Sequence, residues 1–143
     1  MIAIDTNLLI YAHRRGAPEH RRTQAALEAA VERGRGWGIA LPCLAEFWSV
    51  VTSPHSPGGG SSPRQAAGFL QNLLAAGCRI WAPEGTSFES FLSQAQTQAI
   101  RGAEILDLQI AWIAKSQGAR EIWTHDAGFI SIPGLRVVDP LAE

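Results

Sequence analysis

Four carboxylates in the sequence stand in apolar surroundings, where an ionised side chain is costly. The chain has thirteen acidic residues, most of them in polar stretches. The four exceptions interrupt or directly follow hydrophobic runs: Asp5 in MIAID, Glu46 in CLAEFW, Asp107 in ILDLQI and Asp126 in EIWTHD. A carboxylate withdrawn from water destabilises the fold unless a cation or several hydrogen bonds compensate for the lost hydration. These four acids therefore call for a compensating partner.

A divalent cation is the partner that this set of residues favours. No Lys or Arg stands close to any of the four acids in the sequence. Cys43 and Cys78 lack C-x-x-C spacing, and the histidines show no ligand spacing, which argues against zinc. Oxygen ligands favour Mg²⁺ or Mn²⁺. One or two such ions can activate a water molecule and stabilise charge on a phosphodiester, so metal-dependent phosphodiester hydrolysis is the first hypothesis.

Each acid also has a purely structural explanation. Asp5 could cap the helix that follows it, and Asp126 could cap the turn before Phe129. Glu46 could be a paired, partly solvated helix residue, and Asp107 could be favoured by the dipole of a first helical turn. For any one acid the two explanations are evenly balanced, whereas the four together favour the cation.

The hydrophobic periodicity predicts strands that alternate with helices along the chain. Strands are expected at 1–4, 37–41, 78–82 and 121–124, with a fifth candidate at 135–138. Helices are expected at 6–13, 18–33, 42–52, 63–76, around 88–99 and at 103–117. This alternation predicts an α/β fold with a mainly parallel sheet between two layers of helices. A chain of 143 residues has the length of a single domain, 1–143.

This fold would bring the four acids together. Asp5 follows the first strand and Asp126 follows the fourth, which places both at the carboxyl edge of a parallel sheet, where such folds bind ligands. Glu46 lies about one turn into the helix after the second strand. Asp107 lies in the first turns of its own helix. We expect all four to converge at this edge.

Three further features carry expectations of their own. The helix at 103–117 is apolar almost all round and is expected to be deeply buried. The Gly, Ser and Pro tract SPHSPGGGSSP at 53–63 is expected to be a mobile surface loop. Thr86 with Glu89 three residues later forms the capping-box pattern of a helix N-terminus.

Composition narrows the class of protein only modestly. The net charge is -1 and the pI about 6.4, so no overall positive field indicates a nucleic-acid partner or excludes one. No apolar run approaches the ~20 residues of a membrane span, and no leader precedes the first strand. These features predict a soluble, cytoplasmic protein without a membrane partner.

The chain resembles the PIN-domain ribonucleases, and within them the VapC-type toxins of toxin-antitoxin pairs. The matching segments are IDTNLLIYA at 4–12, the helix with Glu46, ILDLQIAWIA at 105–114 and WTHDAGFISIPGLRVVDPL at 123–141. The last two blocks combine an Asp-x-x-x-Ala-x-x-Ala helix with Thr-x-Asp-x-x-Phe after a strand. The combination is more specific than either motif alone.

The resemblance implies a fold, a site and partners. The fold would be a three-layer α/β/α arrangement of about five strands in the order 3-2-1-4-5. Asp5, Glu46, Asp107 and Asp126 would be the catalytic acids that hold Mg²⁺ or Mn²⁺, with Asp5 and Asp107 as direct ligands. Asn7 and Thr124 would support them by orienting the acids or water. The implied activity is cleavage of cellular RNA, and the implied partners are an antitoxin protein and a second copy in a homodimer.

Some alternatives stay open beside this reading. Glu104 could be a fifth ligand, although a first-turn acid favoured by the helix dipole is slightly preferred. The six arginines between 14 and 35 could position an RNA backbone or form a solvated helix face. A catalytically inactive PIN-like module that binds RNA or a partner is the competing function. An aspartyl phosphatase fits poorly, because position 7 is Asn and Lys115 falls mid-helix.

Overall fold

A five-stranded parallel sheet forms the centre of the computed structural model, which describes residues 1–85 and 88–143. The strands are β1 (Ile2–Ile4), β2 (Trp37–Ala40), β3 (Cys78–Trp81), β4 (Glu121–Trp123) and β5 (Arg136–Val138). Their order is β3-β2-β1-β4-β5, and every neighbouring pair is parallel. The predicted strand order is confirmed.

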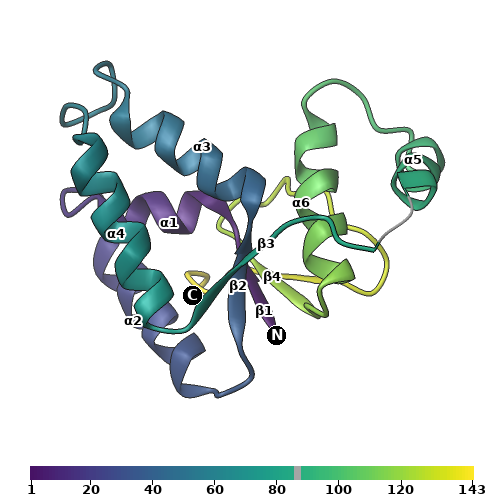
Figure 1. The fold of residues 1–143 in the computed structure, drawn as a ribbon, viewed down its shortest axis with the longest axis horizontal. Helices are drawn as coiled ribbons and strands as arrows, with labels where there is room; N and C mark the ends of the chain where they lie inside the picture. Colours follow the sequence, from purple (N-terminus) through teal and green to yellow (C-terminus); the bar gives the residue numbers. More distant parts are fainter. Residues whose placement is uncertain (86–87) are drawn as a thin grey trace.

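Helices cover both faces of this sheet. They are α1 (Thr6–His13), α2 (His20–Glu32), α3 (Leu41–Thr52), α4 (Pro63–Ala75), α5 (Phe88–Thr97) and α6 (Glu104–Ser116). Figure 1 shows α1 to α4 on the left of the sheet and α5 and α6 on the right. The three-layer α/β/α prediction is therefore confirmed. None of the helices within the described ranges is long and apolar enough to cross a membrane.

The two central strands explain why the sequence begins with an apolar run. Ile2, Ala3 and Ile4 of β1 are each at most 3% exposed, because helices pack against both faces of this strand. In β2, Gly38 lets Trp81 of the neighbouring strand lie close above the backbone. A Cβ at Gly38 would come within 2.7 Å of the Trp81 ring and of the Arg79 carbonyl oxygen.

Local signals set several helix ends. Asp5 is the N-cap of α1 and accepts a hydrogen bond from the Thr6 amide at 2.7 Å. Ser62 and Gln65 form a reciprocal capping box at the start of α4. The expected capping box of Thr86 and Glu89 lies outside the described residues, because Thr86 is not among them.

The prediction that α6 is deeply buried was wrong for its first turn. Leu106 is 55% exposed, whereas the segment from Ile110 to Ala114 is buried throughout. A 13-residue helix spans about 20 Å, roughly twice the length of a three-residue strand. The first turn of α6 therefore extends past the carboxyl edge of the sheet, where no core covers it.

The segment 53–63 is a surface loop, but several contacts tether it. The Arg14 guanidinium donates to the carbonyl oxygen of Gly59 at 2.8 Å and to that of Val51 at 3.2 Å, and also to the Ser56 hydroxyl. His13 Nε2 lies 2.8 Å from the Ser61 hydroxyl. Arg14 thus holds this loop against α1 and α3, so its guanidinium is not available to bind a ligand.

Candidate active site

The backbone of the sheet places the first acid beside β4. The Asp5 amide donates to the Trp123 carbonyl oxygen at 3.0 Å, and the Thr124 amide donates to the Val138 carbonyl oxygen at 2.9 Å. Both residues therefore continue the strand pairing one step beyond β1 and β4. Their side chains meet at the carboxyl edge of the sheet, where the Thr124 hydroxyl donates to Asp5.

The Asp5 carboxylate is held by neutral donors. Its Oδ2 accepts hydrogen bonds from the Thr124 hydroxyl at 2.8 Å and from the Asn7 amide at 3.1 Å. Its Oδ1 accepts the cap bond from Thr6 and faces Cys43 Sγ at 3.9 Å. The side chain is buried, with 6% of the residue exposed. These bonds fix its orientation without balancing its charge.

The electrostatics of Asp5 reflect this missing charge balance. Burial raises its pKa from 3.8 to about 6, and the negative charges of Asp107 and Glu46 add to the effect. The hydrogen bonds from Thr124 and Thr6 pull the pKa of Asp5 in the opposite direction without cancelling the rise. Across residues 1–85 and 88–143, no Lys or Arg forms an ion pair with Asp5.

Asp107 is the second acid at this edge and lies in the exposed first turns of α6. Its Oδ2 accepts a hydrogen bond from the Ile130 amide at 3.2 Å, which joins α6 to the loop after β4. Partial burial raises the pKa of Asp107, and the charges of Asp126, Glu46 and Glu104 raise it further. The charges that raise the pKa of Asp107 are thus all carboxylates, and two of them, Asp126 and Glu46, belong to the predicted set.

Glu46 and Asp126 are exposed, and each accepts one hydrogen bond from a neighbouring group. Glu46 Oε2 accepts a hydrogen bond from the Thr6 hydroxyl at 3.2 Å, and Asp126 Oδ1 accepts one from the Gly128 amide at 2.8 Å. As these side chains stand, no three Asp, Glu, His or Cys residues in the described part of the chain form a group ready to hold a metal ion. The four acids share one edge of the sheet and repel one another without converging on one point.

The donor chemistry at this edge fits a hard divalent cation. Asp5 and Asp107 are carboxylates whose charged forms are disfavoured by burial and by their acidic neighbours, so a cation between them would remove a real cost. Cys43 is the soft donor closest to Asp5. Burial raises the pKa of the Cys43 thiol far above its usual range, which keeps it protonated and unsuited to metal binding.

Glu104 is occupied at the start of α6. Its Oε1 accepts a hydrogen bond from the Arg101 amide at 2.9 Å, in the turn that leads into the helix, and an acid in this first turn is favoured by the helix dipole. Its charge still contributes to the raised pKa of Asp107. The geometry thus supports the structural explanation of Glu104 over a role as fifth ligand.

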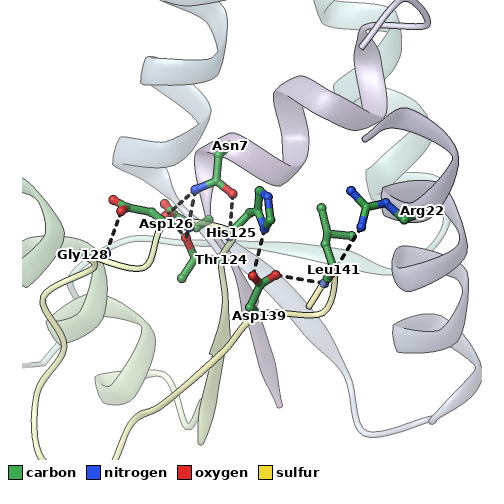
Figure 2. A network of polar contacts seen from close by, with 9 residues as sticks. Asn7, Arg22, Thr124, His125, Asp126, Gly128, Asp139 and Leu141 are labelled. Atoms are coloured by element: carbon green, nitrogen blue, oxygen red, sulfur yellow. Dashed lines mark hydrogen bonds and ion pairs between the residues drawn. The ribbon is translucent and has the colours of Figure 1, made fainter. Parts of the chain in front are cut away.

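A network of polar contacts links the site to the C-terminal segment (Figure 2). Asn7 donates from Nδ2 to the Thr124 hydroxyl at 2.9 Å, and its Oδ1 accepts from the His125 amide at 3.0 Å. His125 Nδ1 lies 2.9 Å from Asp139 Oδ2, and Asp139 Oδ1 accepts from the Leu141 amide at 2.9 Å. Asn7 therefore connects the Asp5 site to the C-terminal segment.

Two parts of this arrangement were not predicted from the sequence. Thr6 joins the site by donating its amide to Asp5 and its hydroxyl to Glu46, and its position between Asp5 and Asn7 was the available signal. The pairing of His125 with Asp139 spans 14 residues and has no local periodicity that could reveal it. Both residues do fall within the segment 123–141 that carries the family resemblance.

Comparisons with known proteins identify the family of the chain. A family model described as PIN domain matches residues 2–135. The chain is 30% identical to Ribonuclease VapC43 of Mycobacterium tuberculosis over 142 residues, which cover 99% of this chain and 96% of that relative. It is also 25% identical to Ribonuclease VapC48 of the same organism over 144 residues, covering 96% of each.

A solved structure shares the fold at lower sequence identity. VapBC2 from Rickettsia felis, bound to a DNA fragment from their promoter, is 21% identical with a TM-score of 0.64 and covers 96% of this chain and 98% of that chain. The sheet, the acidic edge and these matches together define the class of protein. The chain belongs to the PIN domain family, among relatives that are VapC ribonucleases.

Proposed function

We propose that this chain is a divalent-metal-dependent endoribonuclease and the toxin of a toxin-antitoxin pair. The observation that carries the proposal is the state of Asp5, a buried carboxylate held by neutral donors, whose pKa is raised to about 6 beside a second acid. Such an acid is destabilising unless a cation binds. The names of the relatives, which are ribonucleases, support RNA as the substrate.

The residues at the sheet edge divide the work between them. Asp5 and Asp107 would hold Mg²⁺ or Mn²⁺ directly, and Glu46 and Asp126 would complete its surroundings. When bound, the cation supplies activation of a water molecule and neutralises charge that develops on the phosphodiester. Thr124 holds one Asp5 oxygen in place, because its hydroxyl donates to Asp5 and accepts from the Asp126 amide at 3.1 Å.

Cleavage of single-stranded RNA by the purified protein tests the proposal. We expect cleavage with Mg²⁺ or Mn²⁺ and none with EDTA. Asp5→Asn and Asp107→Asn should each lower the rate at least about 100-fold, because each removes a charged cation ligand. Product formation is followed on a labelled oligonucleotide.

Glu28→Gln is the matched control for this experiment, since it removes one carboxylate from the exposed surface of α2. The control should cleave like the wild type. Undiminished cleavage by Asp5→Asn would refute the proposed site. RNA binding without cleavage at any Mg²⁺ or Mn²⁺ concentration would instead assign the chain to the inactive binding modules.

The antitoxin partner has its own test. Expression of the chain should arrest growth, and co-expression of a small protein encoded beside it should relieve the arrest. The resemblance to VapC-type toxins and the likeness to a relative named VapC support this expectation. Growth unaffected by the active protein would show that the chain is a nuclease but not a toxin.

A homodimer is also proposed, and light scattering of the purified chain measures it.

A further inference from the structure

A second charged feature lies at the opposite edge of the sheet from the acids. It is a cavity of about 360 Å³, lined by Met1, Ile2, Arg33, Arg35, Arg120 and Glu121. Ile2 and Glu121 are paired neighbours at the starts of β1 and β4. The cavity therefore opens at the amino ends of these strands, about 10 Å along β1 from Asp5.

The chain brings the three arginines to this cavity from two connections. Arg33 and Arg35 lie in the turn between α2 and β2, on either side of Gly34, whose φ of +63° lets the chain reverse. Arg120 immediately precedes β4. Its amide donates to the Met1 carbonyl oxygen at 3.1 Å, and its carbonyl oxygen accepts from the Arg136 amide at 2.9 Å. The backbone of Arg120 is thus fixed between the starts of β1 and β5.

One acid faces three arginines in the cavity wall, and its charge interacts with Arg33 and with Arg136, which lies outside the lining. Glu121 is engaged on both oxygens, by the Arg136 guanidinium on Oε1 and by Trp123 Nε1 at 3.1 Å on Oε2. Arg33 lies over the Trp123 ring at 5.5 Å. Within residues 1–85 and 88–143, Arg35 and Arg120 form no ion pair. The cavity wall therefore carries an excess of positive charge.

Helix ends alone do not account for this arrangement. Cations are favoured near a helix C-terminus, and α2 ends just before Arg33. The last turn of α2 is nevertheless closed by backbone groups, since the Arg33 amide donates to Ala29 and the Gly34 amide to Val31. The helix dipole explains the sign of the charge near Arg33, but not why Arg35 and Arg120 line the same cavity.

We infer that this cavity binds a phosphate group through Arg33, Arg35 and Arg120. Guanidinium groups recognise phosphate oxygens in pairs, through a fork of donors that matches their spacing. The phosphate is either a small ligand, inorganic phosphate or a nucleotide phosphate, or the backbone of bound RNA at a distance from the cleaved bond. The acids at the other edge take no part, so phosphate binding at the cavity needs no metal ion, and only the RNA alternative rests on the proposed function.

Titration of inorganic phosphate into the ¹⁵N-labelled protein tests the inference. The titration is done in EDTA at constant ionic strength, with chloride in the parallel titration. We expect saturable shifts of the amide signals of residues 33–37 and 119–122 with phosphate and not with chloride. Arg35→Gln combined with Arg120→Gln should weaken phosphate binding at least about tenfold. The variant Arg35→Lys with Arg120→Lys keeps the charge but loses the guanidinium fork. Its affinity for phosphate should therefore lie between that of the wild type and that of the Gln variant.

The matched control removes two positive charges elsewhere. Arg21→Gln with Arg64→Gln changes exposed arginines of α2 and α4 and should bind phosphate like the wild type. The spectra without phosphate verify that each variant is folded. The inference fails if the wild type shows no saturable shift, if chloride causes the same shift, or if the control pair loses as much affinity as the cavity pair.

A second titration identifies the source of the phosphate. Single-stranded RNA is bound to the wild type and to the cavity variant in EDTA over a range of salt. If the cavity holds the RNA backbone, the variant binds RNA more weakly, its salt slope falls by about one to two, and inorganic phosphate competes. If phosphate binds at the cavity while RNA affinity is unchanged, the ligand is small, and adenosine monophosphate should bind there. Loss of phosphate binding with intact RNA cleavage separates this site from the acids.

Discussion

At the scale of the residue, Asp5 combines a structural and a chemical role. Its Oδ1 caps α1, and its Oδ2 is held by Thr124 and Asn7 from two other parts of the fold. The capping explanation and the cation explanation of this acid are therefore not alternatives. The cap fixes one oxygen, and the buried position at the sheet edge gives the carboxylate its raised pKa.

The raised pKa of Asp5 makes a prediction about stability and pH. The native state binds a proton at Asp5 more tightly than the unfolded chain, because the pKa is about 6 instead of 3.8. Stability contributed by this group is therefore present below pH 3.8 and is lost as pH rises toward 6. The loss amounts to about 3 kcal/mol above both values.

Asp5→Asn should remove most of this loss. In EDTA at about pH 8 the variant should unfold at a higher temperature than the wild type, and the difference should shrink or reverse at about pH 4. Its amide cannot accept every bond of the carboxylate, so the gain stays below the full amount. Thermal unfolding followed by circular dichroism measures it. A wild type that is more stable at both pH values by the same margin would contradict the charge argument.

At the scale of the element, the ends of strands and helices determine which side chains are exposed at the edges of the sheet. The first turn of α6 projects beyond the sheet, which exposes Leu106 and brings Asp107 to the same edge as Asp5. The loop at 53–63 shows the opposite case. Its composition indicates mobility, but Arg14 and His13 of the α1 region tether it through hydrogen bonds that span more than 30 residues.

Removal of this tether should loosen the loop. Arg14→Leu loses the bonds to Gly59, Val51 and Ser56, and we expect broad-specificity protease to cut within 53–61 about tenfold faster. Cleavage sites are read by mass spectrometry under native conditions. Arg21→Leu, at an exposed position of α2, is the control and should leave the rate unchanged. Equal rates in Arg14→Leu and the wild type would show that the loop is held by other contacts.

At the scale of the whole molecule, a net charge of -1 conceals two opposite poles. The parallel sheet directs the carboxyl ends of its strands to one edge, where the acids gather, and the amino ends to the other, where the arginines line a cavity. Composition averages over both poles. A charge count therefore says little about a partner that meets one edge only.

A cation at the acidic pole should stabilise the whole fold. A ligand that binds only the native state adds about 2.7 kcal/mol at a concentration 100 times its dissociation constant. We expect Mn²⁺ to raise the unfolding temperature of the wild type and of Glu28→Gln, and to leave Asp5→Asn and Asp107→Asn nearly unchanged. Differential scanning fluorimetry provides the readout. An equal rise in all four proteins would indicate binding elsewhere.

The sequence by itself determined the architecture and the candidate acids. The alternation of apolar strands with helices specified the α/β class, and the family resemblance added the order of the strands, because both are encoded in local patterns and motifs. Asp5, Glu46, Asp107 and Asp126 stood out because carboxylates in apolar runs are costly wherever the chain goes.

Only the tertiary structure decided how these side chains are held and what else lies nearby. Contacts between residues far apart in sequence produce the Thr6–Glu46 hydrogen bond, the His125–Asp139 pair and the cavity lined by arginines. Periodicity reports which face of an element is buried, not which neighbour that face meets. Hydrogen bonds and charge balance depend on those neighbours, so they emerge only when the elements are packed.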